Sequence, residues 1–232
     1  MGKKNSKTQC DLQRCLMCRM CIPEWLPAIA AHRRNMQYKK GEEVFKEGDS
    51  VSGIYFVYRG SVKIHKHWGE EKELIVRFAR QGDIFGHRGF GTDPLYPISA
   101  TALEPLEVCY IDQDFFYATL RTNTELLFKL MLFYAQELQE SEKNMRNLAH
   151  MPVKGRLANV LLKLKEKFGV NKNGFIAITL SRQDIAAYAG TTYETVFRLM
   201  TAFTRENIVS ISGKDIGIID EERLVQLTRE AN

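Results

Sequence analysis

Seven side chains between residues 127 and 148 follow alternating spacings of four and three, the repeat that is typical of a coiled-coil helix. Pro152 follows shortly afterwards and ends any helix built on this repeat. A helix this long presents a stripe of side chains that needs a packing partner. The helix also divides the chain into a segment before residue 127 and a segment after Pro152. The repeat consists of Leu127, Met131, Tyr134, Leu138, Ser141, Met145 and Leu148.

This repeat favours a homodimer in which the helix pairs with its copy, because no other long helix is evident in the preceding segment. A helix packed on its own domain is the alternative. Ser141 within the repeat weakens the pairing while favouring one register, which suits a dimer whose pairing can be switched.

The segment from residue 39 to residue 112 has a different period, with short β-type runs separated by glycine turns. Strands do not alternate with helices here, which argues against a parallel α/β sheet. The pattern predicts a closed or rolled antiparallel sheet. Its expected strands are 53–58, 61–65, 73–78, 98–102 and 108–111.

Beyond Pro152 the pattern predicts a compact helical segment that begins with a helix over 153–168. Ser181 is a natural N-cap with Asp184 three residues later, and Gly190 permits a tight turn before a second helix capped by Thr191 or Thr192. This pattern indicates a helix-turn-helix. Residues 208–219 then predict a hairpin wing.

The second of these helices has a polar and aromatic outer face. Glu194 can accept a hydrogen bond from cytosine, Arg198 can bind guanine through two hydrogen bonds, and Phe197 can contact a thymine methyl or pack inward. A Glu194–Arg198 surface ion pair on an ordinary helix is the competing interpretation. The candidate DNA-binding residues are Tyr193, Glu194, Phe197 and Arg198, with Arg182, Thr192, Thr195 and Lys214 placed for phosphates.

Cysteine and charge are concentrated near the N-terminus. Four of the five cysteines lie within twelve residues, at Cys10, Cys15, Cys18 and Cys21, while Cys109 stands apart. In a reducing compartment this crowding favours a metal site over disulfides. Residues 1–40 hold nine Lys or Arg against two Asp or Glu, whereas residues 41–150 hold 12 against 17, which suggests separate tasks for separate segments.

A rolled β-domain, a long dimer helix and a winged helix-turn-helix in this order resemble the CRP/FNR family of bacterial transcription regulators. Residues 82–86 (Gly-Asp-Ile-Phe-Gly) are similar to the family's turn before its effector site, and residues 194–198 are similar to its recognition-helix core. The resemblance implies an α+β fold with a cyclic-nucleotide-binding-like β-roll (jelly roll). We expect a cysteine-rich segment over 1–24, the sensory β-roll over 25–120, the dimerisation helix over 121–150 and the DNA-binding domain over 151–232.

Cyclic AMP is not an expected ligand. Family members that bind cyclic nucleotides carry a Gly-Glu pair for the ribose and an Arg-Ser pair for the phosphate. The corresponding positions here resemble Gly86-His87 and Ile98-Ser99. A buried phosphate without its arginine is costly.

The cysteines instead resemble the FNR branch, which carries an N-terminal cluster and one cysteine after the β-roll. The resemblance implies a [4Fe–4S] cluster on Cys15, Cys18, Cys21 and Cys109. The spacing of the N-terminal cysteines is more compact than in that branch, so Cys10 remains an alternative ligand. Structural zinc on Cys10, Cys15, Cys18 and Cys21, or a thiol/disulfide switch, are further possibilities.

These features predict a homodimeric transcription regulator that senses oxygen, nitric oxide or redox state and reads a near-palindromic site in double-stranded DNA. RNA polymerase is the expected further partner. A regulator with zinc or no metal and a small-molecule effector in the β-roll is the alternative, and an iron–sulfur electron-transfer protein is a remote one. No catalytic constellation is visible, so we do not expect an enzyme. The polar N-terminus without an apolar run predicts a cytoplasmic protein with no membrane partner.

Overall fold

The computed structural model describes residues 16–69 and 72–229. The chain divides into two compact units: the first ends at Leu138 and the second begins at Gln139, with the stretch His67–Ile75 grouped with the second. The two units are described separately. None of the described helices is both long enough and apolar enough to cross a bilayer.

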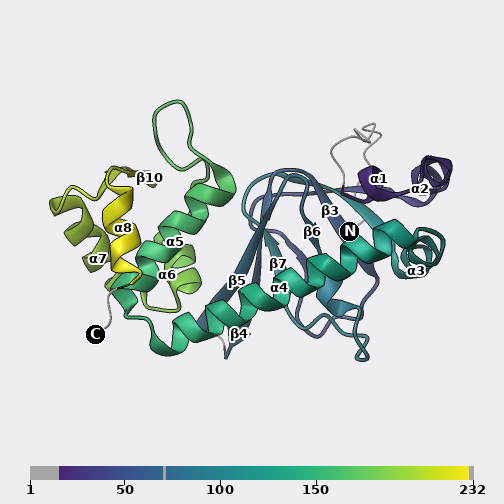
Figure 1. Cartoon of the computed structure of the whole chain (residues 1–232), viewed down its shortest axis with the longest axis horizontal. Coiled ribbons are helices and arrows are strands. Elements are labelled where there is room, and N and C mark those ends of the chain that lie inside the picture. Colours follow the sequence, from purple (N-terminus) through teal and green to yellow (C-terminus); the bar gives the residue numbers. More distant parts are fainter. Residues whose placement is uncertain (1–15, 70–71, 230–232) are drawn as a thin grey trace. The chain divides into compact units, whose positions relative to one another are not determined.

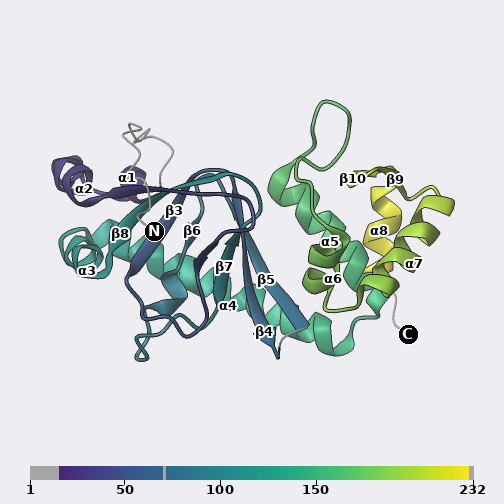
Figure 2. The same ribbon diagram turned by 180° about the vertical axis from the view of Figure 1, so that it is seen from behind.

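Two four-stranded sheets build the first unit, and they run in the orders β1-β8-β3-β6 and β2-β7-β4-β5 (Figures 1 and 2). The strand pairs for which a register is defined are antiparallel. The predicted rolled antiparallel sheet is therefore confirmed, with three short strands, β1, β2 and β6, added to the five expected ones. The strands are β1 Arg34–Tyr38, β2 Glu43–Phe45, β3 Gly53–Arg59, β4 Ser61–Trp68, β5 Lys72–Arg80, β6 Ile84–Phe85, β7 Ser99–Ala102 and β8 Leu106–Asp112.

A core of aliphatic and aromatic side chains from both sheets fills this β-roll. Phe45 stacks on Tyr96 with their ring centroids 3.9 Å apart, and Tyr55 stacks on Phe85 at 5.0 Å. The turn between β3 and β4 requires Gly60, whose φ is +90° and whose absent β-carbon would lie 2.5 Å from the Pro105 carbonyl oxygen.

Helices precede and follow the β-roll in sequence, and one short helix lies within it. The first are α1 Leu16–Met20, the 3-10 helix Pro23–Trp25 and α2 Leu26–His32, and a second 3-10 helix spans His87–Gly89. After β8, Asp112 caps α3 Gln113–Thr122 by accepting a hydrogen bond from the Phe115 amide. The long helix α4 Thr124–His150 follows a break at Asn123.

The second unit holds the predicted helix-turn-helix. Ser181 and Asp184 form a capping box at the start of α6, Gly190 takes a left-handed conformation after it, and Thr192 caps α7. The hairpin wing is also present, with Ser212 paired to Asp215. The elements are α5 Val153–Phe168, α6 Arg182–Ala189, α7 Tyr193–Arg205, β9 Val209–Ser212, β10 Asp215–Ile218 and α8 Glu221–Leu227.

Candidate functional sites: the α7 face, the α4 stripe and the buried cysteines

Helix α7 buries one side and leaves the other open to solvent. Val196, Met200 and Phe203 lie in the core of the second unit. On the outer side Phe197 is 60% exposed, and its ring stacks on Tyr193 with 6.4 Å between centroids. Phe197 therefore does not pack inward, and an exposed aromatic pair stands on the first two turns of the helix.

Glu194 and Arg198 are exposed on the same side of α7. No ion pair joins them in the described part of the chain, so the surface pair that their spacing allows is not formed. The pKa of Glu194 is lowered by a hydrogen bond to its own backbone amide and by one from Thr192. Because Glu194 and Arg198 are exposed and not paired with each other, both side chains can bind an external partner.

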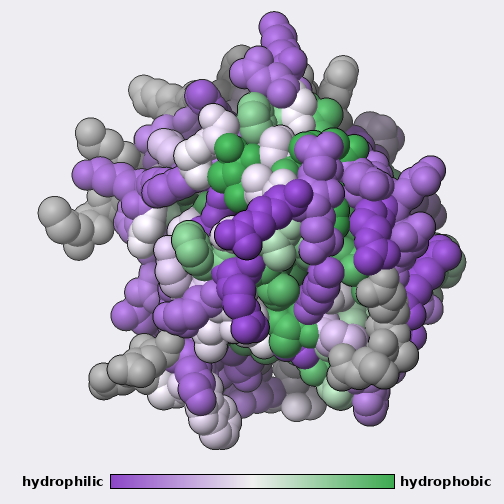
Figure 3. Space-filling view, turned by 90° about the vertical axis from the view of Figure 1, so that its left-hand side faces the viewer, coloured by the Kyte–Doolittle hydropathy of each residue, from purple (hydrophilic) through white to green (hydrophobic). Residues whose placement is uncertain are grey.

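The residues expected to contact phosphates lie on α6, at the start of α7 and in the wing. Thr192 accepts a hydrogen bond from the Thr195 amide, and Arg182 donates to the Lys214 carbonyl oxygen at 3.5 Å, which links α6 to the wing. Lys214 itself is exposed at the tip of the hairpin. Seen from the side on which α7 and α8 lie in Figure 1, long hydrophilic side chains surround a smaller apolar area (Figure 3).

Arg156 of α5 holds the turn of the helix-turn-helix against the end of α4. Its Nε donates to the Ala189 carbonyl oxygen at 2.9 Å and one terminal nitrogen donates to that of Gly190 at 3.1 Å. The other terminal nitrogen donates to the carbonyl oxygens of Leu148 and Met151. One guanidinium thus provides hydrogen bonds to backbone carbonyl groups at the C-terminal ends of α4 and α6.

The repeat on α4 is largely open to solvent. Leu127, Met131, Leu138 and Met145 are exposed, as are Phe128 and Leu132, which the repeat did not include. Tyr134 differs, since it is half-buried and its hydroxyl donates to the His87 carbonyl oxygen at 2.6 Å. The α4 stripe, defined as these exposed apolar residues, is therefore wider than the predicted one.

A different side of α4 packs on its own β-roll. Leu126 and Leu130 are buried, Phe133 is half-buried, and Glu137 continues the same spacing of four and three. This second stripe was present in the sequence and would have indicated a helix that packs on its own domain while its other side stays open.

Three of the candidate metal ligands meet in one buried cluster, which we term the cysteine cluster. Cys18 in α1, Cys21 just after it and Cys109 in β8 are 5%, 8% and 3% exposed, and they belong to the same apolar core. Leu126 and Leu130 of α4 belong to that core too. Cys10 and Cys15 lie outside the described residues.

Asn123 ties the cysteine segment to the α3–α4 junction, a role that sequence reasoning missed. Its side-chain oxygen accepts a hydrogen bond from the Ile22 amide at 2.8 Å, and its side-chain nitrogen donates to the Thr119 carbonyl oxygen. The Trp25 indole donates to the Thr119 hydroxyl at 3.0 Å. The sequence carried no signal for this role, because the partner Ile22 lies 101 positions away and the expected helix over 121–150 ran through Asn123.

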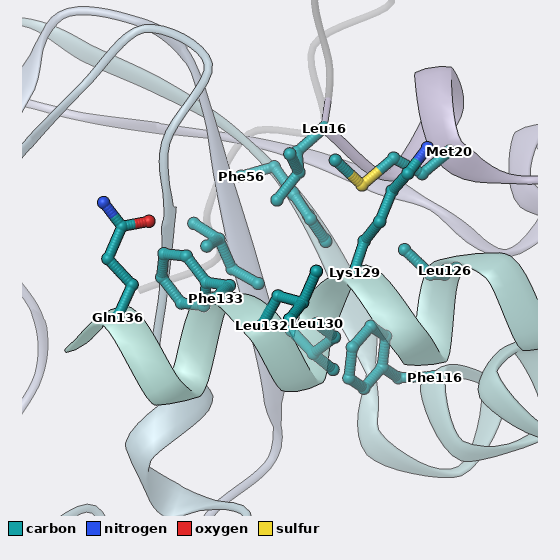
Figure 4. Close-up of a pocket in the computed structure, with 11 residues that line it drawn as sticks. Leu16, Met20, Phe56, Phe116, Leu126, Lys129, Leu130, Leu132, Phe133 and Gln136 are labelled. Atoms are coloured by element: carbon teal, nitrogen blue, oxygen red, sulfur yellow. The ribbon is translucent and has the colours of Figure 1, made fainter. Parts of the chain in front are cut away.

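An apolar cavity of about 250 Å³ lies between α1 and α4 (Figure 4). Leu126 and Leu130, which line it, also belong to the core that holds the three cysteines. Leu16 and Met20 enter it from α1, while Leu130 and Phe133 enter it from α4. The side of α1 that does not carry Cys18 therefore borders this cavity, whereas the side with Met17 and Cys18 packs in the core. Lys129 and Gln136 supply the polar part of the lining.

The positions expected to bind a nucleotide in cyclic-nucleotide-binding relatives have other partners here. His87 is buried against α4, and the Ser99 hydroxyl accepts a hydrogen bond from the Glu47 amide at 2.9 Å. A separate cavity of about 550 Å³ opens in the β-roll and is lined by Arg34, Met36, Val44, Phe45, Asp49, Ser50, Ser52, Tyr55, Tyr96 and Tyr110.

The sequence matches two families of domains. Residues 35–123 match the cyclic nucleotide-binding domain, and residues 155–227 match the Crp-like helix-turn-helix domain.

Proteins of known role are similar over nearly the whole chain. The CRP-like cAMP-activated global transcriptional regulator of Mycobacterium tuberculosis is 26% identical over 209 residues, 89% of this chain and 93% of that protein. The anaerobic regulatory protein of Haemophilus influenzae is 29% identical over 241 residues, 98% of this chain and 92% of that protein.

The solved structure of FixK2 from Bradyrhizobium japonicum superposes with a TM-score of 0.77 at 26% identity and covers 86% of this chain and 99% of its own. The fold of this chain thus agrees with that of FixK2 over most of its length. This chain belongs to the CRP/FNR family of transcription regulators.

Proposed function

We propose that this regulator senses oxygen, nitric oxide or redox state through an iron–sulfur cluster ligated by Cys15, Cys18, Cys21 and Cys109. The supporting observation is the cysteine cluster, in which thiols from α1 and from β8, about ninety positions apart in sequence, share one buried core. Buried thiolates need a cationic partner, and thiolate sulfur is the ligand that iron–sulfur clusters and zinc prefer. When bound, such a cluster would supply a centre that reacts with oxidants.

The residues around the thiols suit a sensor that acts on α4. Leu126 and Leu130 share the core with the cysteines, so a rearrangement of the thiols would move the side chains that seat the helix. Asn123 ties the same segment to the start of α4. We infer that residues 1–24 form the cysteine-rich metal or redox segment, 25–120 the sensory β-roll, 121–150 the dimerisation helix and 151–232 the DNA-binding domain.

Anaerobic purification with metal and sulfide analysis tests the cluster. We expect a broad absorption band near ~400 nm that bleaches in air and about four irons per chain. Cys109→Ala should abolish iron binding, while Cys10→Ala serves as the matched control and should retain it. Iron that survives in Cys109→Ala and is lost in Cys10→Ala would assign the fourth ligand to Cys10.

A colourless protein with one zinc per chain would contradict the iron–sulfur proposal and make the cysteines a structural site. The second candidate is then a small-molecule effector in the β-roll. The 550 Å³ cavity lined in part by Arg34 and three tyrosines favours this candidate, because its size is typical of ligand pockets.

We further propose that a homodimer, paired through the α4 stripe, reads a near-palindromic site. In this proposal Tyr193, Glu194, Phe197 and Arg198 face the bases, while Arg182, Thr192, Thr195 and Lys214 face phosphates. Selection from random duplexes should enrich two half-sites about one helical turn apart. Failure to enrich any sequence in either redox state would overturn this assignment. We expect RNA polymerase to be a further partner of the DNA-bound dimer.

A further inference from the structure

Four charged or ionisable side chains meet where α4 crosses the turn after β6. The Glu137 carboxylate lies 3.4 Å from Nε of Arg77 and 3.1 Å from a terminal nitrogen of Arg88. Nε2 of His87 lies 3.8 Å from the same carboxylate, too far for a hydrogen bond. We term these four residues the Glu137 site; all of them belong to the first unit.

Arg77 and His87 are held in place by contacts besides those with Glu137. Arg77 also donates to the Ile84 carbonyl oxygen at 3.0 Å, and its guanidinium lies 5.5 Å from the centroid of the Phe133 ring. The His87 ring meets Phe133 and Tyr134 edge-on, and Tyr134 donates to the His87 carbonyl oxygen. The fold therefore positions Arg77 and His87, and three α4 residues, Phe133, Tyr134 and Glu137, contact this region.

The charge at this site is unbalanced in favour of an anion. Two guanidiniums face a single carboxylate, and in water-poor surroundings an anion held by two arginines is strongly favoured. Burial alone would raise the pKa of Glu137, but the proximity of His87 and the charges of Arg77 and Arg88 outweigh it and lower this pKa to about 2. The Glu137 side chain remains 19% exposed, so the site is not closed off from solvent.

We propose that Arg77, His87 and Arg88 form a carboxylate-binding site in the β-roll, that Glu137 is its resident ligand, and that this pairing holds α4 on the turn after β6. The Glu137 carboxylate thus occupies the position that a separate anionic ligand would otherwise take. It requires neither a metal nor DNA, so it stands independently of the iron–sulfur proposal.

Chemical rescue tests the site. Glu137→Ala removes the carboxylate and leaves a space that acetate fits, so the amide protons of residues 84–90 should exchange about tenfold faster than in the wild type. Added acetate should restore the protection, and sodium chloride at equal ionic strength should not. Glu125→Ala is the matched control, because Glu125 lies on the same helix in an exposed pair with Lys129 and should change nothing at 84–90.

A second variant separates charge from size. Glu137→Gln fills the same space without the charge, and its exchange at 84–90 should rise and stay insensitive to acetate. Wild-type exchange in Glu137→Gln would overturn the proposal, because size alone would then suffice. Equal rescue by chloride and acetate in Glu137→Ala would overturn it too, since simple screening would explain the result. Iron content measured on the same samples tests the iron–sulfur proposal separately.

Discussion

A β-carbon placed on Gly190 would lie 2.4 Å from Cδ2 of Leu148, so the turn of the helix-turn-helix rests directly on the last turn of α4. Gly190 also has a φ of +62°, which disfavours any side chain. This contact joins the end of α4, the helix that we propose pairs two chains, to the turn that precedes α7, and both contact residues lie in the second unit.

Substitution of this glycine should loosen the junction. We expect Gly190→Ala to destabilise the second unit by roughly 1–3 kcal/mol, through backbone strain and displacement of Leu148. Gly213→Ala is the matched control, because its φ is similar at +61° but nothing lies within 4 Å of its added carbon. Thermal unfolding measures both, and equal losses would show that the contact with Leu148 contributes nothing.

The Glu137 carboxylate predicts an acid-sensitive first unit. Its pKa is lowered from 4.5 to about 2 in the folded chain, so the unfolded chain binds the proton more readily between these values. The stabilisation is present above pH 4.5, is lost as the pH falls towards 2 and amounts to roughly 3 kcal/mol. Glu137→Gln should flatten this part of the pH profile in urea unfolding followed by Trp25 fluorescence in a Trp68→Phe background. Glu125→Gln should leave it as steep as in the wild type.

His87 predicts a second pH dependence at higher pH. Burial is the main cause that lowers its pKa below 6.5, the nearby arginines add to this, and Glu137 opposes it. The folded chain therefore holds the neutral ring, and stability should fall as the pH drops below 6.5, where the unfolded chain takes up the proton. His87→Gln should remove the loss between pH 7 and 5.5, whereas the exposed His150→Gln should not. A wild-type slope in His87→Gln would assign the effect to another group.

Arg198 is expected to carry base recognition. Arg198→Ala should cost roughly 1–3 kcal/mol of affinity for the selected operator and relax specificity at one position. Arg205→Ala, in the last turn of the same helix, is the control. It should lower the affinity for the operator and for random duplexes by the same factor. Fluorescence anisotropy with both duplexes gives the comparison, and an unchanged ratio for Arg198→Ala would remove it from the reading face.

The exposed Phe197 ring predicts a thymine contact. Replacing one thymine of the operator by deoxyuridine removes a single methyl group, which should weaken wild-type binding about fourfold at the contacted base pair. The same replacement should have no effect on Phe197→Ala, because the partner of the methyl is then absent. Thymine methyls that matter equally to both proteins would instead place Phe197 away from the bases.

Local pattern was sufficient for much of the fold. The turn chemistry around Gly60 and Gly190, the capping box at Ser181 and the helix that ends at Phe168 depend on neighbours in sequence, and all were predictable. The exposed face of α7 was also predictable, because residues three and four apart on a helix share a side. Short strands such as β6 were not predictable, since two residues carry no period.

Other features depend on residues that lie far apart in the chain. Glu137 meets Arg88 across 49 positions, Asn123 meets Ile22 across 101, and Cys109 enters the core of Cys18 and Cys21. The four-three spacing on α4 indicated one stripe, but the packed structure assigns one side to the β-roll, leaves the other open and draws Tyr134 toward His87. Periodicity follows from backbone geometry and is therefore written locally, whereas these pairings form only when burial brings distant side chains into the same small volume.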